Sequence, residues 1–566
     1  EVYANDYHRE LLRSSERLQA TIHQPLGAVP LPLGLSESGM VITEGAGPAD
    51  LGANEYNSMY LDEGFGLQAK VLGGTQGTGA YDVAVNGNRE TLAFSLGQYR
   101  YKSDGYRENN DVDYKISNAF VQWQPTQNLG FQAELGQRDD NIGDLTTEFG
   151  ANTHSTTSRV VGESETQRVS MKYQSDSGTY LVLNVTDKDE SNVAEDTLAL
   201  PGLTIEFTND EKINSSQYEL QLVHEFRHTT LSGGLKSSES KSTGASSLYY
   251  VEFDALDSTE TSSKNSLEQA YLYSDIAALN NSLIVTLGAE HNSAEHVVQV
   301  GVDGQPVENK NDKTIYPKMG VAWDITPKIK LRTAYFTTLS MVPKISGSLN
   351  STHIAGVAQV YDHFNAGTTS SNKTLGVNIA ASDRAKIGLD ILKQNIMLPN
   401  NTGLQFVDSD MQYDLVSTHF DYLLTEKLST YIKLSTEQVD RNPISNEPLP
   451  LYPLTLQNNS LNIGLSYQLT SSSSIKIEGK HIDQQYSTES IPDLFIDSED
   501  FSERLNVIDA SIQANLPNRL GKVTLLAKNL LNTEFTYADL ELMHSTPSRQ
   551  ELTPERTLLL KFELNI

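Results

Sequence analysis

The final stretch of the chain, residues 556–566, constrains the fold more than any other. It reads RTLLLKFELNI, with an apolar side chain at every second position and mostly polar side chains between them. Because successive side chains of a β-strand point to opposite faces, this alternation predicts a strand with one wholly apolar face. Such a strand suits a soluble sheet that covers a core. It also suits the closing strand of a membrane barrel, because lipid tolerates no open sheet edge. The residues expected on the apolar face of this barrel-closing strand are Leu558, Leu560, Phe562, Leu564 and Ile566.

The same alternation recurs along the chain from residue 65 onward. In residues 461–469 large apolar side chains alternate with Asn, Gly, Ser and Gln, the chain then reverses through the serines of 471–474, and a second alternating segment follows. Counting all such segments gives about 22 strands, at about 23 residues for each strand and its connection, which is typical of large outer-membrane barrels. The sequence therefore predicts an all-β fold, in which residues 65–566 form a transmembrane antiparallel β-barrel.

The connections between the alternating segments are of two lengths. Outer-membrane barrels have short periplasmic turns and long extracellular loops, an asymmetry for which a soluble sandwich or solenoid has no reason. Short connections are expected at 124–128, 324–328, 424–427, 471–474 and 516–519, and long ones at 143–165, 188–212, 240–263, 295–312, 340–371, 440–456, 487–502 and 538–555.

Aromatic residues stand just before several of the short connections. Trp and Tyr are enriched where a barrel wall meets the membrane–water interface. The sequence therefore predicts an aromatic girdle at the periplasmic interface, with core aromatics near strand ends as the alternative interpretation. The residues assigned to this girdle are Trp123, Trp323, Tyr422 and Tyr467.

Composition excludes several classes of protein. The net charge of −31 and the isoelectric point of about 4.7 make nucleic acid a poor partner. Cysteine is absent, which excludes disulfides, thiolate metal sites and Cys nucleophiles. No apolar run reaches about 18 residues, so no transmembrane helix is expected. The chain begins at Glu1 with neither Met nor a leader, so we expect a mature or truncated product.

Residues 1–64 differ in character from the rest of the chain. The spacing of Tyr and Leu over 3–21 predicts one amphipathic helix. The Pro-rich sequence PLGAVPLPLGL and the Gly-rich sequence ITEGAGPADLGANEYN follow, and both favour extended chain and turns. We expect either a linker from an upstream domain, on the periplasmic side, or a segment that enters or caps the barrel mouth.

Three short motifs in the barrel region resemble one known family. Residues 103–109 read SDGYREN, residues 528–535 read KNLLNTEF, and Pro-Glu-Arg opens the final strand. These motifs and their order resemble those of TonB-dependent outer-membrane receptors. The final strand is also similar to the C-terminal signal of outer-membrane barrels, although that signal usually ends in Phe. The resemblance covers residues 65–566 and implies a barrel in the outer membrane of a Gram-negative bacterium. The matching positions are Asp104, Gly105, Tyr106, Arg107, Asn109, Asn529, Leu530, Phe535, Pro554 and Arg556.

Two features of that family have no counterpart before residue 65. TonB-dependent receptors carry a globular plug and a TonB box, and residues 1–64 resemble neither. The resemblance therefore implies a plug-less barrel, or a receptor whose plug is absent or supplied separately. Residues 30–60 with the following barrel are also similar to outer-membrane proteins in which periplasmic tetratricopeptide repeats precede a receptor-like barrel. The helix predicted over 3–21 would then end such a repeat, stacked on upstream neighbours.

A barrel of about 22 strands encloses a lumen that natural examples keep plugged. Residues 1–64, inward-folded loops, a partner or an upstream domain could fill it. Residues 341–370 are comparatively apolar and low in charge, as expected of a loop that folds inward. The acidic residues that remain are expected to line the lumen and to favour cationic or neutral cargo.

No stretch of the sequence carries a catalytic or cofactor-binding motif. GTQGTG at 74–79 precedes no helix, so we expect a hairpin turn rather than a nucleotide-binding loop. The 12 histidines are scattered, and His291 and His296, the nearest approach to a metal pair, are expected to be loop residues. Acidic clusters such as 187–190 and 497–500 lack the spacing of a calcium loop and predict solvated faces, with calcium bridging as the alternative. The sequence thus predicts no enzyme, no cofactor and no metal site.

These observations favour a transport or export conduit that works with a periplasmic partner protein or an upstream repeat domain. Its other expected partners are outer-membrane lipid and lipopolysaccharide. Its cargo is open. One alternative is a non-conducting anchor or scaffold for a periplasmic or surface assembly. A second is an uptake receptor of the TonB-dependent type, and a third is a soluble or secreted all-β protein such as an adhesin.

Overall fold

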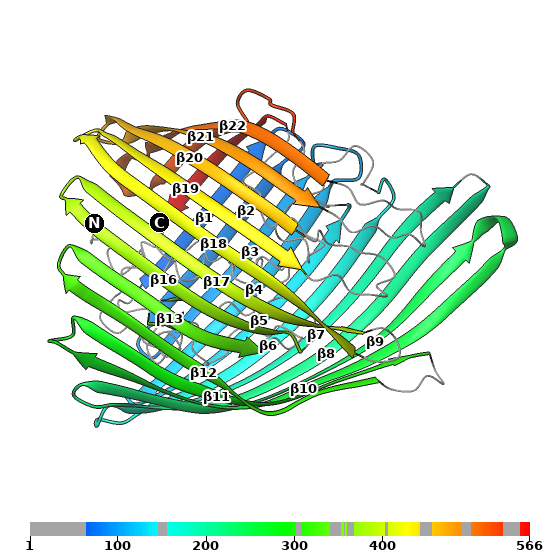
Figure 1. Ribbon diagram of the computed structural model, residues 1–566, viewed down its shortest axis with the longest axis horizontal. Coiled ribbons are helices and arrows are strands. Elements are labelled where there is room, and N and C mark those ends of the chain that lie inside the picture. Colours follow the sequence, from blue (N-terminus) through cyan, green and yellow to red (C-terminus); the bar gives the residue numbers. More distant parts are fainter. Residues whose placement is uncertain are drawn as a thin grey trace.

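A closed sheet of 22 antiparallel strands makes up nearly all of the described molecule (Figure 1). This sheet confirms the predicted barrel of about 22 strands. The helix and linker predicted before residue 64 lie outside the described residues. The computed structural model describes residues 64–144, 155–200, 202–301, 307–339, 353–355, 357–358, 367–401, 406–441, 455–487, 500–535 and 555–565.

The 22 wall strands follow one another around the barrel in chain order, each paired with the next. Among the residues that the structure describes, no helix has the length and apolar character needed to cross a membrane. The strands are β1 (Gly64–Gly74), β2 (Gly79–Arg89), β3 (Leu92–Ser103), β4 (Val112–Thr126), β5 (Leu129–Ile142), β6 (Arg159–Gln174), β7 (Thr179–Leu200), β8 (Leu203–Glu225), β9 (Thr229–Tyr250), β10 (Ala255–Ala278), β11 (Leu283–Val300), β12 (Val307–Thr326), β13 (Ile329–Leu339), β14 (His353–Ile354), β15 (Val357–Ala358), β16 (Thr369–Ser382), β17 (Ala385–Asn401), β18 (Phe406–Thr425), β19 (Leu428–Arg441), β20 (Thr455–Thr470), β21 (Ser473–Ser487), β22 (Asp500–Asn515), β23 (Gly521–Lys528) and β24 (Thr557–Asn565). Two 3₁₀ turns, η1 (Val251–Phe253) and η3 (Pro517–Arg519), complete the described elements. β14 and β15 pair only with each other, and β13 pairs with β16.

The last strand closes the barrel. β24 pairs with β23 on one side and with β1 on the other, so that Phe562 lies between Val523 and Val71. Leu559, Lys561 and Glu563 of β24 are less exposed and face inward. Ile566 lies outside the described residues. The predicted apolar face points outward, with 38–44% of each side chain exposed at Leu558, Leu560, Phe562 and Leu564.

The two ends of the barrel carry different connections. The turns after β2, β4, β6, β8, β10, β12, β16, β18, β20 and β22 have two to five residues and lie where β1 begins and β24 ends. We call this the short-turn end. The longest connections, after β5, β13, β19, β21 and β23, lie at the opposite end, which we call the long-loop end.

The outer face of the wall is apolar near the short-turn end and polar farther along. On β7, Leu183 and Val185 are exposed while their neighbours Asn184 and Thr186 are buried on the inner face. The next outward residues toward the long-loop end are acidic, beginning with Asp187. An outward apolar band over an inward polar face is the pattern of a membrane-spanning barrel.

Strands β7 to β10 extend past their neighbours at the long-loop end (Figure 1). β10 has 24 residues, whereas about 9–11 residues are enough to cross a bilayer. β6 begins opposite Glu195 and β11 ends opposite Thr261, so β7 to β10 continue beyond these points as a projecting sheet.

The predicted long connections at 188–212 and 240–263 are therefore wrong. These residues form paired strands: β7 runs to Leu200, β8 begins at Leu203, and β9 and β10 are joined through residues 251–254. The connection predicted at 295–312 likewise shortens to 301–306. The projecting strands have solvent on both faces, so their sequences lack the apolar alternation by which the other strands are found.

Candidate functional site

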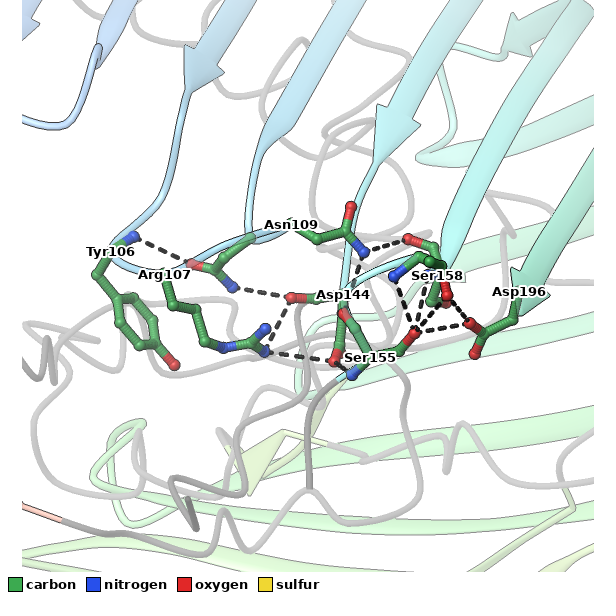
Figure 2. Close-up of polar contacts among 9 residues, drawn as sticks. Tyr106, Arg107, Asn109, Asp144, Ser155, Ser158 and Asp196 are labelled. Atoms are coloured by element: carbon green, nitrogen blue, oxygen red, sulfur yellow. Dashed lines mark hydrogen bonds and ion pairs between the residues drawn. The ribbon is translucent and has the colours of Figure 1, made fainter. Parts of the chain in front are cut away.

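A network of polar contacts joins three segments at the long-loop end of β3 to β7. The Arg107 guanidinium lies 3.6 Å from the Asp144 carboxylate and donates a hydrogen bond of 2.9 Å to the Asp144 carbonyl oxygen. The same carboxylate accepts the Ser155 N–H at 2.6 Å, and the Ser155 hydroxyl donates to Asp196 at 2.6 Å. Figure 2 shows these groups as a continuous chain that runs from the β3–β4 connection to β7.

The β3–β4 connection, residues 104–111, is itself a compact turn. Gly105 has φ +75°, and a Cβ there would lie 2.1 Å from the Asn110 carbonyl oxygen, so glycine is required. The Tyr106 N–H donates to the Asn110 side chain at 3.3 Å. The Asn109 amide donates to the carbonyl oxygens of Ser155 and Ser158 at 3.1 and 2.7 Å (Figure 2). The motif residues thus shape one turn and fasten it to the next connection.

An ion pair reinforces this network at the start of β6. Both terminal nitrogens of Arg159 donate to the Asp111 carboxylate, at 3.1 and 2.8 Å. These hydrogen bonds hold the pKa of Asp111 below its usual range. The stabilisation is therefore fully present above the ordinary carboxyl pKa and is lost as the pH falls through the lowered value.

Removing the charge of Asp144 should loosen the connections that it joins. We expect Asp144→Asn to weaken the local structure by about 1.5–3 kcal/mol, since hydrogen bonds to a charged group are lost. Hydrogen exchange at the Ser155 amide measures this directly. Glu108→Gln, at an exposed position of the β3–β4 connection that Asp144 contacts, is the matched control and should leave that amide unchanged. Equal exchange rates in the two variants would contradict the role of the network.

The second motif folds back against the inner wall beside β22. The Asn529 N–H donates to the Asp509 carboxylate at 2.8 Å, and the Asn529 side chain exchanges two hydrogen bonds of 2.9 Å with the Thr533 backbone. Leu530 stays exposed, and the Arg556 N–H donates to the side chain of Asn532. Pro554 lies outside the described residues. Phe535 completes a buried cluster with Ile482, Leu505 and Val507.

The turn between β1 and β2 connects the two motif regions. The Asp104 N–H donates to the Gln76 carbonyl oxygen at 2.8 Å, and the Thr557 hydroxyl lies 3.3 Å from the Gln76 side-chain oxygen. Gln76 and Thr557 are 481 positions apart in the chain. This turn is part of the GTQGTG segment, 74–79, for which the predicted hairpin turn is confirmed.

Part of the long connection between β13 and β16 lies inside the barrel. β14 and β15 pair as a small hairpin, in which Ile354 and Val357 are fully buried. The cluster that they join draws residues from β10, β13 and β17 to β20, and strands as far apart in the sheet as β10 and β20 can meet only across the lumen. The predicted inward folding of 341–370 is confirmed for Ile354 and Val357. Of the rest of this range, the structure describes only residues 353, 355, 358 and 367–370. The wall contributes Tyr271, Tyr273, Ala334, Phe336, Leu392, Tyr413, Leu415, Val439 and Leu456 to this hairpin cluster.

A glycine of β12 makes room for the hairpin. A Cβ at Gly320 would lie 2.7 Å from the Ala355 Cβ and 2.8 Å from the Ile354 Cγ2. Real side chains do not approach so closely, so any larger residue at Gly320 would displace the hairpin. The wall is therefore shaped to hold this segment.

A buried ion pair lies beside the hairpin cluster. Lys318 of β12 and Glu290 of β11 are 0% and 1% exposed, with their charged atoms 3.2 Å apart. The Tyr273 hydroxyl donates to the other Glu290 oxygen at 2.6 Å, and Tyr273 also packs in the hairpin cluster. Two buried charges are tolerated only as a well-bonded pair, so these three residues act as one unit. Their separation along the chain hid them from the sequence analysis.

Many charged side chains of the described inner wall form ion pairs with one another. In each of these pairs the carboxylate has a basic neighbour on the same or an adjacent strand, and the lining of the lumen by the remaining acidic residues stays a prediction. The pairs are Lys70–Asp82, Arg138–Asp140, Arg168–Glu134, Lys188–Glu190, Lys236–Glu219, Lys318–Glu290, Lys476–Glu478, Lys480–Asp509 and Lys522–Glu563.

The four predicted interface aromatics stand at the short-turn end. Trp123 and Tyr467 are exposed on the outer face, and Trp323 and Tyr422 are half-buried. Trp123 stacks on Phe131 of the next strand, with ring centroids 5.6 Å apart. Their service as a membrane-interface girdle stays a prediction.

The two histidines considered as a metal pair lie in β11 rather than in a loop, on opposite faces of the wall. His296 contacts Asn265 of the inner face, whereas His291 lies among outward residues. Within the described ranges, no group of three or more His, Cys, Asp or Glu side chains could hold a metal ion.

Comparisons with known proteins identify relatives by fold alone. No protein-family model matches the chain, and no curated protein matches its sequence. Among solved structures, the unliganded ferric citrate transporter FecA has a TM-score of 0.65 at 12% identity, over 89% of this chain and 79% of that one. The copper transporter OprC has a TM-score of 0.66 at 12% identity, over 89% and 81%.

A third similar structure is that of an outer-membrane receptor. The ferripyoverdine receptor of the outer membrane of Pseudomonas aeruginosa has a TM-score of 0.63 at 10% identity, over 89% of this chain and 72% of that one. At these identities the likeness concerns the fold only. The chain therefore has the barrel fold of large outer-membrane transporters and receptors.

Proposed function

We propose that this protein is a gated conduit in the outer membrane of a Gram-negative bacterium. Residues 65–566 form its barrel, and residues 1–64 lie on its periplasmic side. The hairpin β14–β15, held inside the lumen, carries this proposal. A barrel of 22 strands left empty would be a wide aqueous pore, and a segment of the same chain that narrows it is what a gate requires.

The asymmetry of the two barrel ends supports an orientation. Short turns are typical of the periplasmic side, where β1 also begins and β24 ends. A periplasmic partner or an upstream repeat domain would act on the lumen from this end. The paired charges of the inner wall support a polar cargo of low net charge.

A TonB-dependent type of uptake is the second candidate function. It is supported by the motif residues, which build one continuous rim through Gln76, and by the fold shared with transporters of ferric citrate and copper. In this version the plug is supplied separately or by upstream residues. Both candidates require the lumen to open, whereas a membrane anchor does not.

Conductance across a planar bilayer tests the proposal. The intact protein is expected to stay closed, and a variant lacking residues 353–358 is expected to show large conductance steps. Removing residues 248–257 from the tip of the β9–β10 projection is the matched control and should leave the barrel closed. A folded variant without the hairpin that stays closed would favour the anchor and exclude the hairpin as a gate.

A further inference from the structure

We propose that the projecting sheet of β7 to β10 is a docking site for a basic, extended segment of a partner protein, which adds a strand to the free edge of β10. The sheet stands beyond the barrel wall at the long-loop end (Figure 1). It is separate from the hairpin in the lumen, so the proposal does not depend on the conduit. Only its placement at the cell surface rests on the orientation proposed above.

The edge of β10 is open beyond the end of β11. Next to the last paired residues of these strands, the Gly301 N–H donates to the Glu260 carbonyl oxygen at 2.6 Å. The backbone groups of alternate residues point to the same side of a strand, so those of Ser258 and Leu256 also point toward this edge. Within the described ranges, no strand pairs with these two residues on that side. Their N–H and C=O groups offer the template that an added strand requires.

The opposite edge of the projection, on β7, is capped by side chains. The Thr157 hydroxyl accepts the Thr197 N–H at 3.1 Å and donates to the Asp196 carboxylate at 2.8 Å. Sheets are protected at their edges in such ways because an unpaired strand recruits other chains. The described residues protect the β7 edge and leave the β10 edge free, so an added strand is directed to β10.

The charge of the projection selects a basic partner. Every charged residue in the outermost ranges, 195–208 and 247–260, is acidic. The nearest lysines on β8 to β10, which are Lys212, Lys241 and Lys264, lie closer to the barrel. A basic segment is therefore attracted to the outer part of the sheet, and an acidic one is repelled. The acidic residues are Glu195, Asp196, Glu206, Glu252, Asp254, Asp257 and Glu260.

The same charge excludes a second copy of this chain as the occupant. If two copies paired antiparallel through both free residues of each edge, Leu256 of one copy would lie opposite Ser258 of the other. The Asp257 side chains of the two copies would then lie directly opposite each other, and like charges in that position destabilise a sheet. The occupant is therefore a different chain, with basic residues.

Apolar side chains beside the edge define the rest of the partner segment. Leu256 is 66% exposed and lies opposite Tyr249, and Phe253 of η1 is 70% exposed. Large apolar side chains that gather on a surface mark an interaction site. Successive side chains of an added strand point to opposite faces, so basic residues would lie on the face of Asp257 and apolar residues on the face of Leu256. The segment that fits alternates lysine or arginine with apolar residues.

A synthetic peptide of alternating lysine and valine, added to the purified full chain in non-ionic detergent, tests the proposal. Anisotropy of the labelled peptide should show binding that weakens as salt is raised, and a peptide with glutamate in place of lysine should not bind. Ser258→Pro removes the free N–H and keeps the ladder to β9, because an edge strand tolerates proline where its N–H faces solvent. We expect Ser258→Pro and Asp257→Lys each to weaken binding by at least about tenfold.

Two further variants serve as controls. Ala199→Pro places a proline at the edge of β7, and Glu163→Lys makes the same change of charge at an exposed position of β6. Both should bind the peptide as the intact protein does. Heat-modifiable migration on gels verifies that each variant forms a barrel.

Hydrogen exchange identifies the residues that pair. In the free protein the Leu256 and Ser258 amides should exchange fast, and the lysine–valine peptide should slow both. Slow exchange without the peptide, equal binding of the glutamate peptide, or undiminished binding by Ser258→Pro would overturn the proposal. A dimer of this chain that the peptide dissociates would do the same, because the edge would then pair with a second copy. None of these results affects the conductance test, so the two proposals fail separately.

Discussion

Replacing Lys318 by methionine should lower the free energy of unfolding by about 3–5 kcal/mol, because it leaves the buried Glu290 without a cation. The Tyr273 hydroxyl still donates to that carboxylate but cannot neutralise it. Since Tyr273 also contacts the hairpin cluster, we expect the lumen segment to loosen with the wall. Urea titration of the protein folded into lipid vesicles measures the change.

Two further variants isolate the buried charge as the cause. Lys330→Met removes a lysine that is 39% exposed and pairs with Asp324 at 3.4 Å, so it should cost no more than about 1 kcal/mol. Adding Glu290→Gln to Lys318→Met removes both charges and should restore most of the lost stability. If Lys318→Met costs as little as Lys330→Met, water reaches the ion pair and the packed unit described here does not exist.

Replacing Leu560 by arginine should lower stability by about 2–4 kcal/mol if its side chain meets the middle of the bilayer. Leu560 lies on the outward face of β24, opposite Leu525 of β23 and Gly73 of β1. A charge there must leave water for hydrocarbon. Folding into vesicles under urea again gives the free energy.

The inward neighbour on the same strand provides the control for Leu560. Leu559→Gln places a polar group on the inner face, where polar residues already predominate, and should change stability little. If the two substitutions have similar effects, or if Leu560→Arg folds without lipid or detergent, β24 does not face a membrane.

The strands of the wall proper could be predicted because a barrel imposes one simple pattern on each of them. Residues 461–469 alternate because one face meets lipid and the other meets the lumen, and the structure places them in β20. The inward position of Ile354 and Val357 could also be predicted, since low charge and apolar character are unusual in a long connection. In both cases the signal is local, so one segment of sequence suffices.

The rest of the site could not be predicted because it depends on distant partners. Asp144 belongs to no motif and acquires its role only when the fold brings Arg107 and Ser155 to it. Lys318 and Glu290 likewise show nothing unusual in the sequence until their strands pair. The prediction failed at the projecting ends of β7 to β10 for a different reason. Strands with solvent on both faces show no alternation of apolar and polar residues.

The pairing of β24 with β1 sets the order of events when this chain matures. The Leu558 N–H donates to the Thr75 hydroxyl at 3.1 Å across 483 positions, so this contact can form only after nearly all of the chain is available. Contacts so remote in sequence form slowly, even though their entropic cost grows only with the logarithm of the separation. Until then, β1 and the most recently added strand each expose an unpaired edge that any other strand can join. The partly assembled barrel is therefore the species most exposed to mispairing. Both of its strand edges must be protected until β24 pairs with β1.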